Sequence, residues 1–202
     1  MKKTPLILLT YILLLLIYTG INPYDRLTWI LEIAPAVIGL IFLIILYPKF
    51  KFSNFTLILI TIEMTILIIG GKYSYAKMPL FDYLKDIFNL KRNYYDRLGH
   101  FTQGFIPAMI VREVFIRKNI INGSRWLFYI IIFICLGISA SYELIEFAAA
   151  NIIGRAADSF LGTQGDVWDT QWDMTMALIG AVIAMLTLPN LQDKSIKKIK
   201  AL

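Results

Sequence analysis

FLGTQGDVWDTQWDMTMALIGAVIAMLTL, residues 160–188, joins a glycine-containing turn to three aspartates and a long apolar run. Asp166, Asp169 and Asp173 follow one another at intervals of three and four residues, so a helix would present all three carboxylates on one face. Because the run that follows is apolar, this acidic face is expected at a membrane boundary, where a charge is costly unless it is paired, hydrated or bound to a metal. The pattern therefore indicates where chemistry would take place, but not which reaction.

The composition indicates a membrane protein. Of the 202 residues, 58% are hydrophobic and only 17% are charged, and the mean hydropathy is +0.66. A soluble domain is nearer half apolar and a quarter charged. Several apolar runs are long enough to span a bilayer, and no polar segment is long enough for a soluble domain. We therefore expect an all-α polytopic membrane helical bundle with about six transmembrane helices, in which residues 1–202 form a single domain.

The apolar runs predict where these helices lie. The expected spans are residues 5–21, 29–47, 54–70, 93–116, 126–150 and 168–188. The first run is longer than the apolar core of a signal peptide and lacks a cleavage site, so it is expected to be retained. The least apolar span, 93–116, can cross a bilayer only if it faces other helices or a wet cavity, and it is expected in the middle of the bundle or partly re-entrant.

Two segments outside the spans have distinct patterns. In residues 72–92 the apolar side chains have the spacing of a short helix that lies on the membrane surface, namely Leu80, Phe81, Leu84, Ile87 and Phe88. The tail, residues 189–202, is polar and basic.

Lysines and arginines in the loops predict the orientation. With the N-terminus inside, the cytoplasmic side has eleven of them: Lys2, Lys3, Lys49, Lys51, Arg117, Lys118, Arg125, Lys194, Lys197, Lys198 and Lys200. The outer side has seven: Arg26, Lys72, Lys77, Lys85, Lys91, Arg92 and Arg155. Both termini are therefore expected in the cytoplasm. The basic residues lie between the apolar runs, where membrane orientation and lipid head groups explain them. The net charge of +6 therefore does not indicate a nucleic-acid partner.

In this orientation the unusual polar residues gather at the outer end of the bundle. Asp96 and His100 are four residues apart, and Glu143 and Glu146 are three apart, so each pair shares a helix face. A histidine among carboxylates can run acid–base chemistry, and the candidate catalytic residues are His100, Asp96, Glu143 and Asp173. The same residue types could ligate a divalent cation such as Mg, Ca, Mn or Fe. The candidate metal ligands are His100, Glu143, Glu146, Asp166, Asp169 and Asp173.

Alternatives to this site remain open. The acids could be neutralised by Arg97, Arg112 and Arg155, which would simply lock the helices together. Arg112 and Glu113 are neighbours that point about 100° apart, so they are expected to pair with other groups. Glu63 lies near the middle of an apolar span and could serve transport or a proton relay, or be protonated or bonded to a neighbouring helix.

Three motifs carry a resemblance to a known family. DRLGH (residues 96–100), SYELIEF (141–147) and GTQGDVWDTQWDM (162–174) are similar to motifs of the YjdF-like family of bacterial inner-membrane proteins. More remotely, the chain resembles the VanZ-like superfamily, whose pattern Asp96, His100, Tyr142, Glu143 and Asp169 match. The chain departs from that pattern at Glu146 and Asp173, where VanZ-like proteins often carry amides. The resemblance implies a role in the cell envelope and supplies no proven catalytic residue.

The leading functional expectation is an outward-facing carboxylate and histidine site that binds or modifies an envelope ligand, either lipid-linked or part of the cell wall. The glycine-containing turn GTQGD, residues 162–166, would let a head group approach the backbone closely. The candidate ligand-binding residues are therefore Gly162, Gln164, Gly165 and Arg155. A small ion-coupled transporter that uses Glu63, or a non-catalytic scaffold, are the alternatives. The sequence leaves open whether the protein is an enzyme, and its one general partner is the lipid bilayer.

Overall fold

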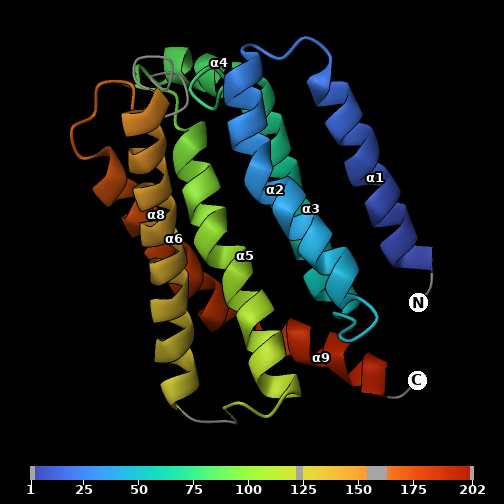
Figure 1. Ribbon diagram of the computed structural model, residues 1–202. Coiled ribbons are helices and arrows are strands. Elements are labelled where there is room, and N and C mark those ends of the chain that lie inside the picture. The colour runs from blue at the N-terminus through green and yellow to red at the C-terminus, as the bar shows by residue number, and fades with distance from the viewer. Residues whose placement is uncertain (1–2, 122–124, 154–162, 201–202) are drawn as a thin grey trace.

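The fold is built from helices alone within the residues that the computed structural model describes, which are 3–121, 125–153 and 163–200. The helices in the described residues are α1 (Lys3–Gly20), α2 (Arg26–Leu46), α3 (Asn54–Lys72), α4 (Pro79–Ile87), α5 (Tyr95–Arg117), α6 (Arg125–Ile153), α8 (Asp169–Thr187) and α9 (Pro189–Lys200) (Figure 1). The expected all-α class is confirmed.

The long apolar helices make the protein polytopic. In the described residues, α1, α2, α3 and α6 are long and apolar enough to cross a membrane, and α8 with α9 forms a further span if this pair, bent by 64°, is counted as one. The difference from the expected six arises at α5, which is too polar to qualify by composition, and at α8, which qualifies only together with α9. The polar side chains of α5 point inward instead, because Arg97, His100, Arg112 and Glu113 are all buried. Such a helix is tolerated in a bundle interior.

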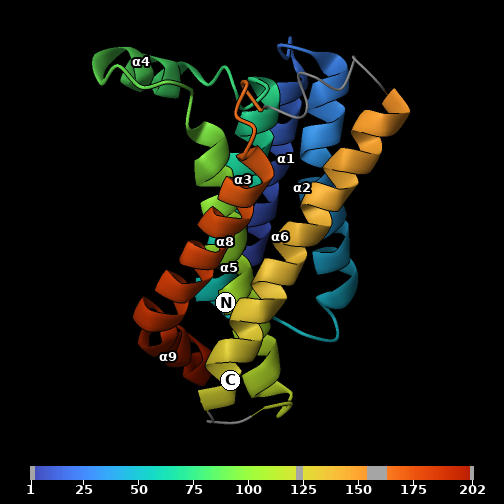
Figure 2. The same ribbon diagram turned by 90° about the vertical axis from the view of Figure 1, so that its left-hand side faces the viewer.

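The long helices form two groups. In the first group, α1 and α2 both pack against α3. In the second, α5 packs against α6 and α8, and the contact between α3 and α5 joins the two groups (Figures 1 and 2).

Helices α5 and α8 approach each other unusually closely, because two glycines face the partner backbone. A Cβ atom on Gly104 would lie 1.8 Å from the carbonyl oxygen of Ala177, and one on Gly180 would lie 2.0 Å from that of Phe101. Small residues at a crossing allow this approach in membrane helices. The close contact sets the distance across which side chains of α5 and α8 can pair.

At the end of the bundle near the termini, polar contacts connect α5 to α3 and α9. Glu113 accepts hydrogen bonds of 2.7 Å from the backbone nitrogen and the hydroxyl of Ser53. Arg112 donates to Gln192 at 2.7 Å and pairs with Asp193 at 2.8 Å. As expected, Arg112 and Glu113 pair with other groups rather than with each other. The tail, expected only to be polar and basic, contains α9, which these contacts and the buried Ile196 hold in place.

The short helix expected in residues 72–92 is present as α4. Its apolar residues Leu80, Ile87 and Phe88 are exposed, which suits contact with lipid. That α4 lies on the membrane surface stays a prediction.

The glycine contact generates a stability prediction. Gly104→Ala is expected to destabilise the protein by about 1–3 kcal/mol or more, because the added methyl group meets backbone atoms that cannot move independently. The matched control is Gly137→Ala in α6, where an added Cβ would meet nothing within 4 Å. Thermal unfolding in mild detergent measures both variants. Equal melting temperatures for Gly104→Ala and Gly137→Ala would contradict the close crossing.

Candidate functional site

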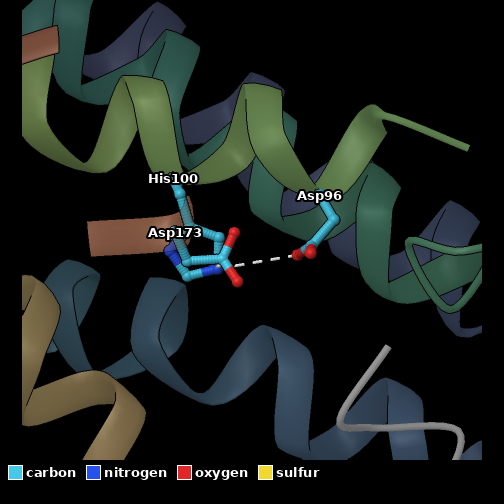
Figure 3. A group of neighbouring side chains, drawn as sticks. All are labelled: Asp96, His100 and Asp173. Atoms are coloured by element: carbon cyan, nitrogen blue, oxygen red, sulfur yellow. Dashed lines mark ion pairs between the residues drawn. The ribbon is translucent and has the colours of Figure 1, made fainter. Parts of the chain in front are cut away.

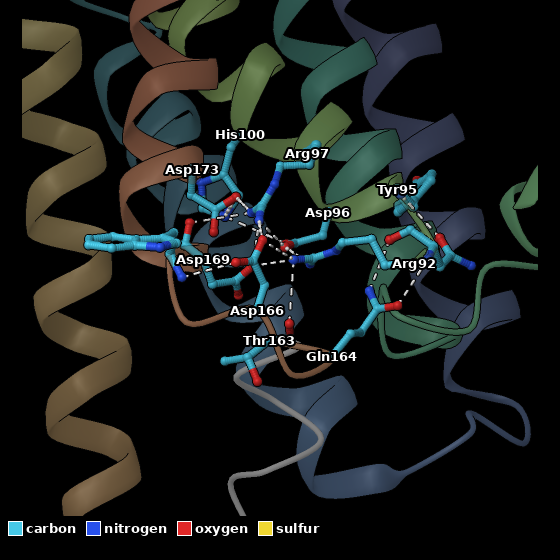
Figure 4. A network of polar contacts seen from close by, with 12 residues as sticks. Arg92, Tyr95, Asp96, Arg97, His100, Thr163, Gln164, Asp166, Asp169 and Asp173 are labelled. Carbon is cyan, nitrogen blue, oxygen red and sulfur yellow. Dashed lines mark hydrogen bonds and ion pairs between the residues drawn. The ribbon is translucent and has the colours of Figure 1, made fainter. Parts of the chain in front are cut away.

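Two arginines and four aspartates form an arginine–aspartate network where α5 and α8 begin (Figure 4). Its members are Arg92, Arg97, Asp96, Asp166, Asp169 and Asp173. Arg97 reaches Asp169 at 2.6 Å and Asp166 at 3.2 Å, and it also pairs with Asp173. Arg92 pairs with Asp169 and reaches Asp96 at 3.2 Å. The network therefore joins the start of α5 to the start of α8.

Burial makes this network energetically important. The side chains of Arg92 and Arg97 are 6% and 8% exposed, and that of Asp173 is 4% exposed. A buried ion pair is weak evidence for net stabilisation, but removing one partner leaves an uncompensated charge, which is strongly destabilising. Four aspartates against two arginines also leave the network with formal negative charge.

The turn that precedes α8 is held by the protein's own groups. The backbone nitrogen of Asn93 donates to Gln164 Oε1 at 2.9 Å, and Gln164 Nε2 donates back to the Asn93 carbonyl at 2.9 Å. The backbone N–H of Trp168 donates to Asp166 at 3.0 Å. That hydrogen bond, and then Arg97 and Arg92, lower the pKa of the Asp166 carboxyl. The charged form of Asp166 is thereby favoured.

This arrangement bears on the candidate ligand-binding residues. Gly165 is exposed and has a φ of 83°, the left-handed region that favours glycine. The amide of Gln164 is already engaged with Asn93. Gly162 and Arg155 lie outside the described residues. A ligand role for any of these four stays a prediction.

His100 lies beside the network at the centre of three carboxylates. Its Nε2 is 3.6 Å from Asp96 Oδ1 and 3.6 Å from Asp173 Oδ1, and its Nδ1 is 3.8 Å from Glu143 Oε1 (Figure 3 shows His100, Asp96 and Asp173). Gln103 Oε1 lies 3.0 Å from Nδ1. The structure thus brings together the four candidate catalytic residues, from α5, α6 and α8.

The same group could hold a divalent cation. The nearest ligand atoms of Asp96, His100 and Asp173 all lie within 4.8 Å of one another. Both aspartates are already paired with arginines, so a cation would have to compete with Arg92 and Arg97. Of the six candidate metal ligands, His100, Asp173 and Glu143 gather here. Asp166 and Asp169 belong to the arginine–aspartate network, and Glu146 lines the cavity described next.

A cavity of about 710 Å³ lies between the two helix groups and reaches Asp96 and His100. Its lining comes mainly from α2, α3, α5 and α6. The polar and ionisable lining residues are Glu32, Glu63, Tyr75, Asp96, His100, Gln103, Ser141, Tyr142 and Glu146. No lysine or arginine is among the residues that line the cavity, and one of its acids, Asp96, pairs with Arg92 of the network. We call it the acidic cavity.

Two of the residues that matter here were missed by sequence reasoning. Glu32 lines the acidic cavity, and its signal was a carboxylate inside an otherwise apolar span. Arg92 lies in the connection before α5, as expected, and its pairing with Asp96 and Asp169 was not anticipated. Among the arginines expected to neutralise the acids, Arg97 does so. Arg112 does not, because it pairs with Asp193 at the other end of α5.

A helical bundle with apolar outer faces and a buried ionic network defines an integral membrane protein. The chain belongs to the family described as "Predicted membrane protein (DUF2238)", which matches residues 4–194. It is 41% identical over 197 residues to "Inner membrane protein YjdF" of Escherichia coli (strain K12), and the alignment covers 96% of this chain and 94% of that protein. No solved structure matches the chain. The YjdF-like resemblance is confirmed, and the VanZ-like one stays a prediction.

The network predicts an asymmetric response to charge removal. Arg97→Gln leaves Asp169 and Asp173 buried with too little positive charge, so it is expected to cost roughly 3–5 kcal/mol of stability. Lys85→Gln is the control, because the Lys85–Asp82 pair has side chains that are 35% and 38% exposed and is worth about 0–1 kcal/mol. Chemical unfolding in detergent, with abundance in the membrane as a second readout, measures both. An Arg97→Gln protein as stable as Lys85→Gln would refute the structural role of the network.

Proposed function

We propose that this protein binds a ligand of the bacterial cell envelope, lipid-linked or part of the cell wall, in the acidic cavity. The observation that carries the proposal is that the cavity reaches Asp96 and His100 and is large enough for a small molecule. Purely structural acids would need no such space beside them. The scaffold role belongs instead to the arginine–aspartate network.

The residues around His100 suit modification of the ligand as well as binding. An imidazole titrates near neutrality and can take or give a proton when hydrogen-bonded to a reacting group. Asp96 and Glu143 lie 3.6 Å and 3.8 Å from its two nitrogens, so they can orient the ring and stabilise its protonated form. We assign His100 the role of acid–base group, with Asp96, Glu143 and Asp173 around it.

The proposed site faces outward. The helices that carry the arginine–aspartate network, α5 and α8, begin toward one end of the bundle, whereas α9 lies at the other end (Figure 1). With both termini in the cytoplasm, as the loop charges favour, the site is nearest the outer leaflet, where envelope molecules are found.

Ion-coupled transport is the second candidate, favoured by one observation. Glu63 lines the acidic cavity, and its Oε2 atom is buried without a hydrogen-bond partner. A carrier, however, needs polar groups along a path through the bilayer. The buried residues of α3 on either side of Glu63 belong to an apolar cluster that includes Leu57, Ile60, Met64 and Ile68. The binding function is therefore the better supported.

Native mass spectrometry of protein purified from bacterial membranes in mild detergent tests the proposal. The wild-type protein is expected to carry a bound envelope molecule. Gly137→Trp is expected to lose it, because Gly137 lines the cavity and has open space at its Cβ position. Leu144→Trp, on an exposed face of the same helix, should keep it. Thermal unfolding verifies that both tryptophan variants are folded. Identical spectra for the two folded variants would contradict binding in the cavity.

A further inference from the structure

The acidic cavity has an imbalance of charge. Among the described residues, Glu32, Glu63 and Glu146 form no ion pair with lysine or arginine, while Arg92 and Arg97 face the aspartates of the network. Unpaired carboxylates are expensive at membrane depth. The cavity therefore favours an occupant with positive charge and disfavours an anion such as phosphate.

The size of the cavity decides against a bare ion as the main occupant. A volume of about 710 Å³ falls within the range of roughly 300–1,000 Å³ typical of sites for small organic molecules. The lining also contains Pro35, Leu67, Ile134, Ile138 and Ile145. An occupant that fills the space must therefore present apolar surface as well as charge.

The cavity opens sideways. Ile138 and Ile145 of α6 line it and are nevertheless 41% and 60% exposed. Pro35 of α2 lines it from the other helix group, and α6 packs against α5 and α8. The exposed rim lies on apolar helices of the membrane-spanning part, so it faces lipid. A molecule can enter there from within the bilayer.

From these three features we infer that the ligand is a membrane amphiphile with an ammonium head group, which enters between α2 and α6. The ammonium lies among Glu32, Glu63 and Glu146, close to His100, and the apolar tail extends past Ile138 and Ile145 into the lipid. An ammonium group donates hydrogen bonds, which the buried, unpartnered Oε2 of Glu63 can accept. This inference rests on the proposed function and gives its ligand a chemical class.

Defined probes test the inference on the full chain in an uncharged maltoside detergent. Dodecylammonium, dodecyl phosphate, dodecanol and butylammonium are added separately, and the melting temperature is followed. Dodecylammonium at about ten times its Kd is expected to raise the melting temperature by about 3–6 °C, since a ligand that binds only the folded state stabilises it. The other three probes should give no comparable rise.

Variants test whether dodecylammonium raises the melting temperature by binding in the acidic cavity. Gly137→Trp should abolish the rise with dodecylammonium, and Leu144→Trp should keep it. Glu63→Gln combined with Glu146→Gln should remove the advantage of dodecylammonium over dodecanol without loss of the folded protein.

The outcomes separate the inference from the proposed function. Dodecyl phosphate or dodecanol could raise the melting temperature as much as dodecylammonium does, with the rise abolished by Gly137→Trp. That result would overturn the ammonium head group and leave binding in the cavity intact. A rise with butylammonium equal to that with dodecylammonium would overturn the amphiphile and its sideways entry. If no probe raises the melting temperature in a way that Gly137→Trp abolishes, the inference is overturned. The proposed function is contradicted as well only if native mass spectrometry shows no bound molecule on the wild-type protein.

Discussion

The pairing of Arg92 and Arg97 with aspartates is the interaction on which the rest of the structure depends. Four acidic side chains converge where α5 and α8 begin, and the two arginines allow two of them, Asp169 and Asp173, to be buried there. The glycine crossing further along the same two helices brings the backbones close enough for these pairs to form. Without the arginines, the burial of so many carboxylates would oppose packing of the second helix group.

This pairing divides the carboxylates into two classes. The aspartates of the network hold helices together, and their positive partners come from the same chain. The glutamates of the acidic cavity have no such partners among the described residues and surround a space rather than a side chain. His100 lies beside both classes, because it is 3.6 Å from Asp173 of the network and itself lines the acidic cavity. A ligand in the cavity would therefore meet the one group suited to proton transfer.

Much of this arrangement is predictable from the sequence, because apolar runs and helical spacing are local signals. The run at 29–47 corresponds to α2 at Arg26–Leu46, and the spacing of Asp96 and His100 places both on the same side of α5. Partner choice between distant segments is not local. The pairing of Arg92 with Asp169, the use of Arg112 by α9, and the place of Glu32 in the cavity wall depend on how helices pack, and one sequence does not specify that.

The division of carboxylates is tested most directly by comparing two amide variants in ligand-free detergent. Asp169→Asn removes a partner shared by both arginines, whereas Glu146→Gln alters a cavity carboxyl group that forms no ion pair with lysine or arginine among the described residues. The account predicts that Asp169→Asn lowers the melting temperature, while Glu146→Gln leaves it unchanged or raises it. Equal destabilisation by both variants, or greater destabilisation by Glu146→Gln, would contradict it.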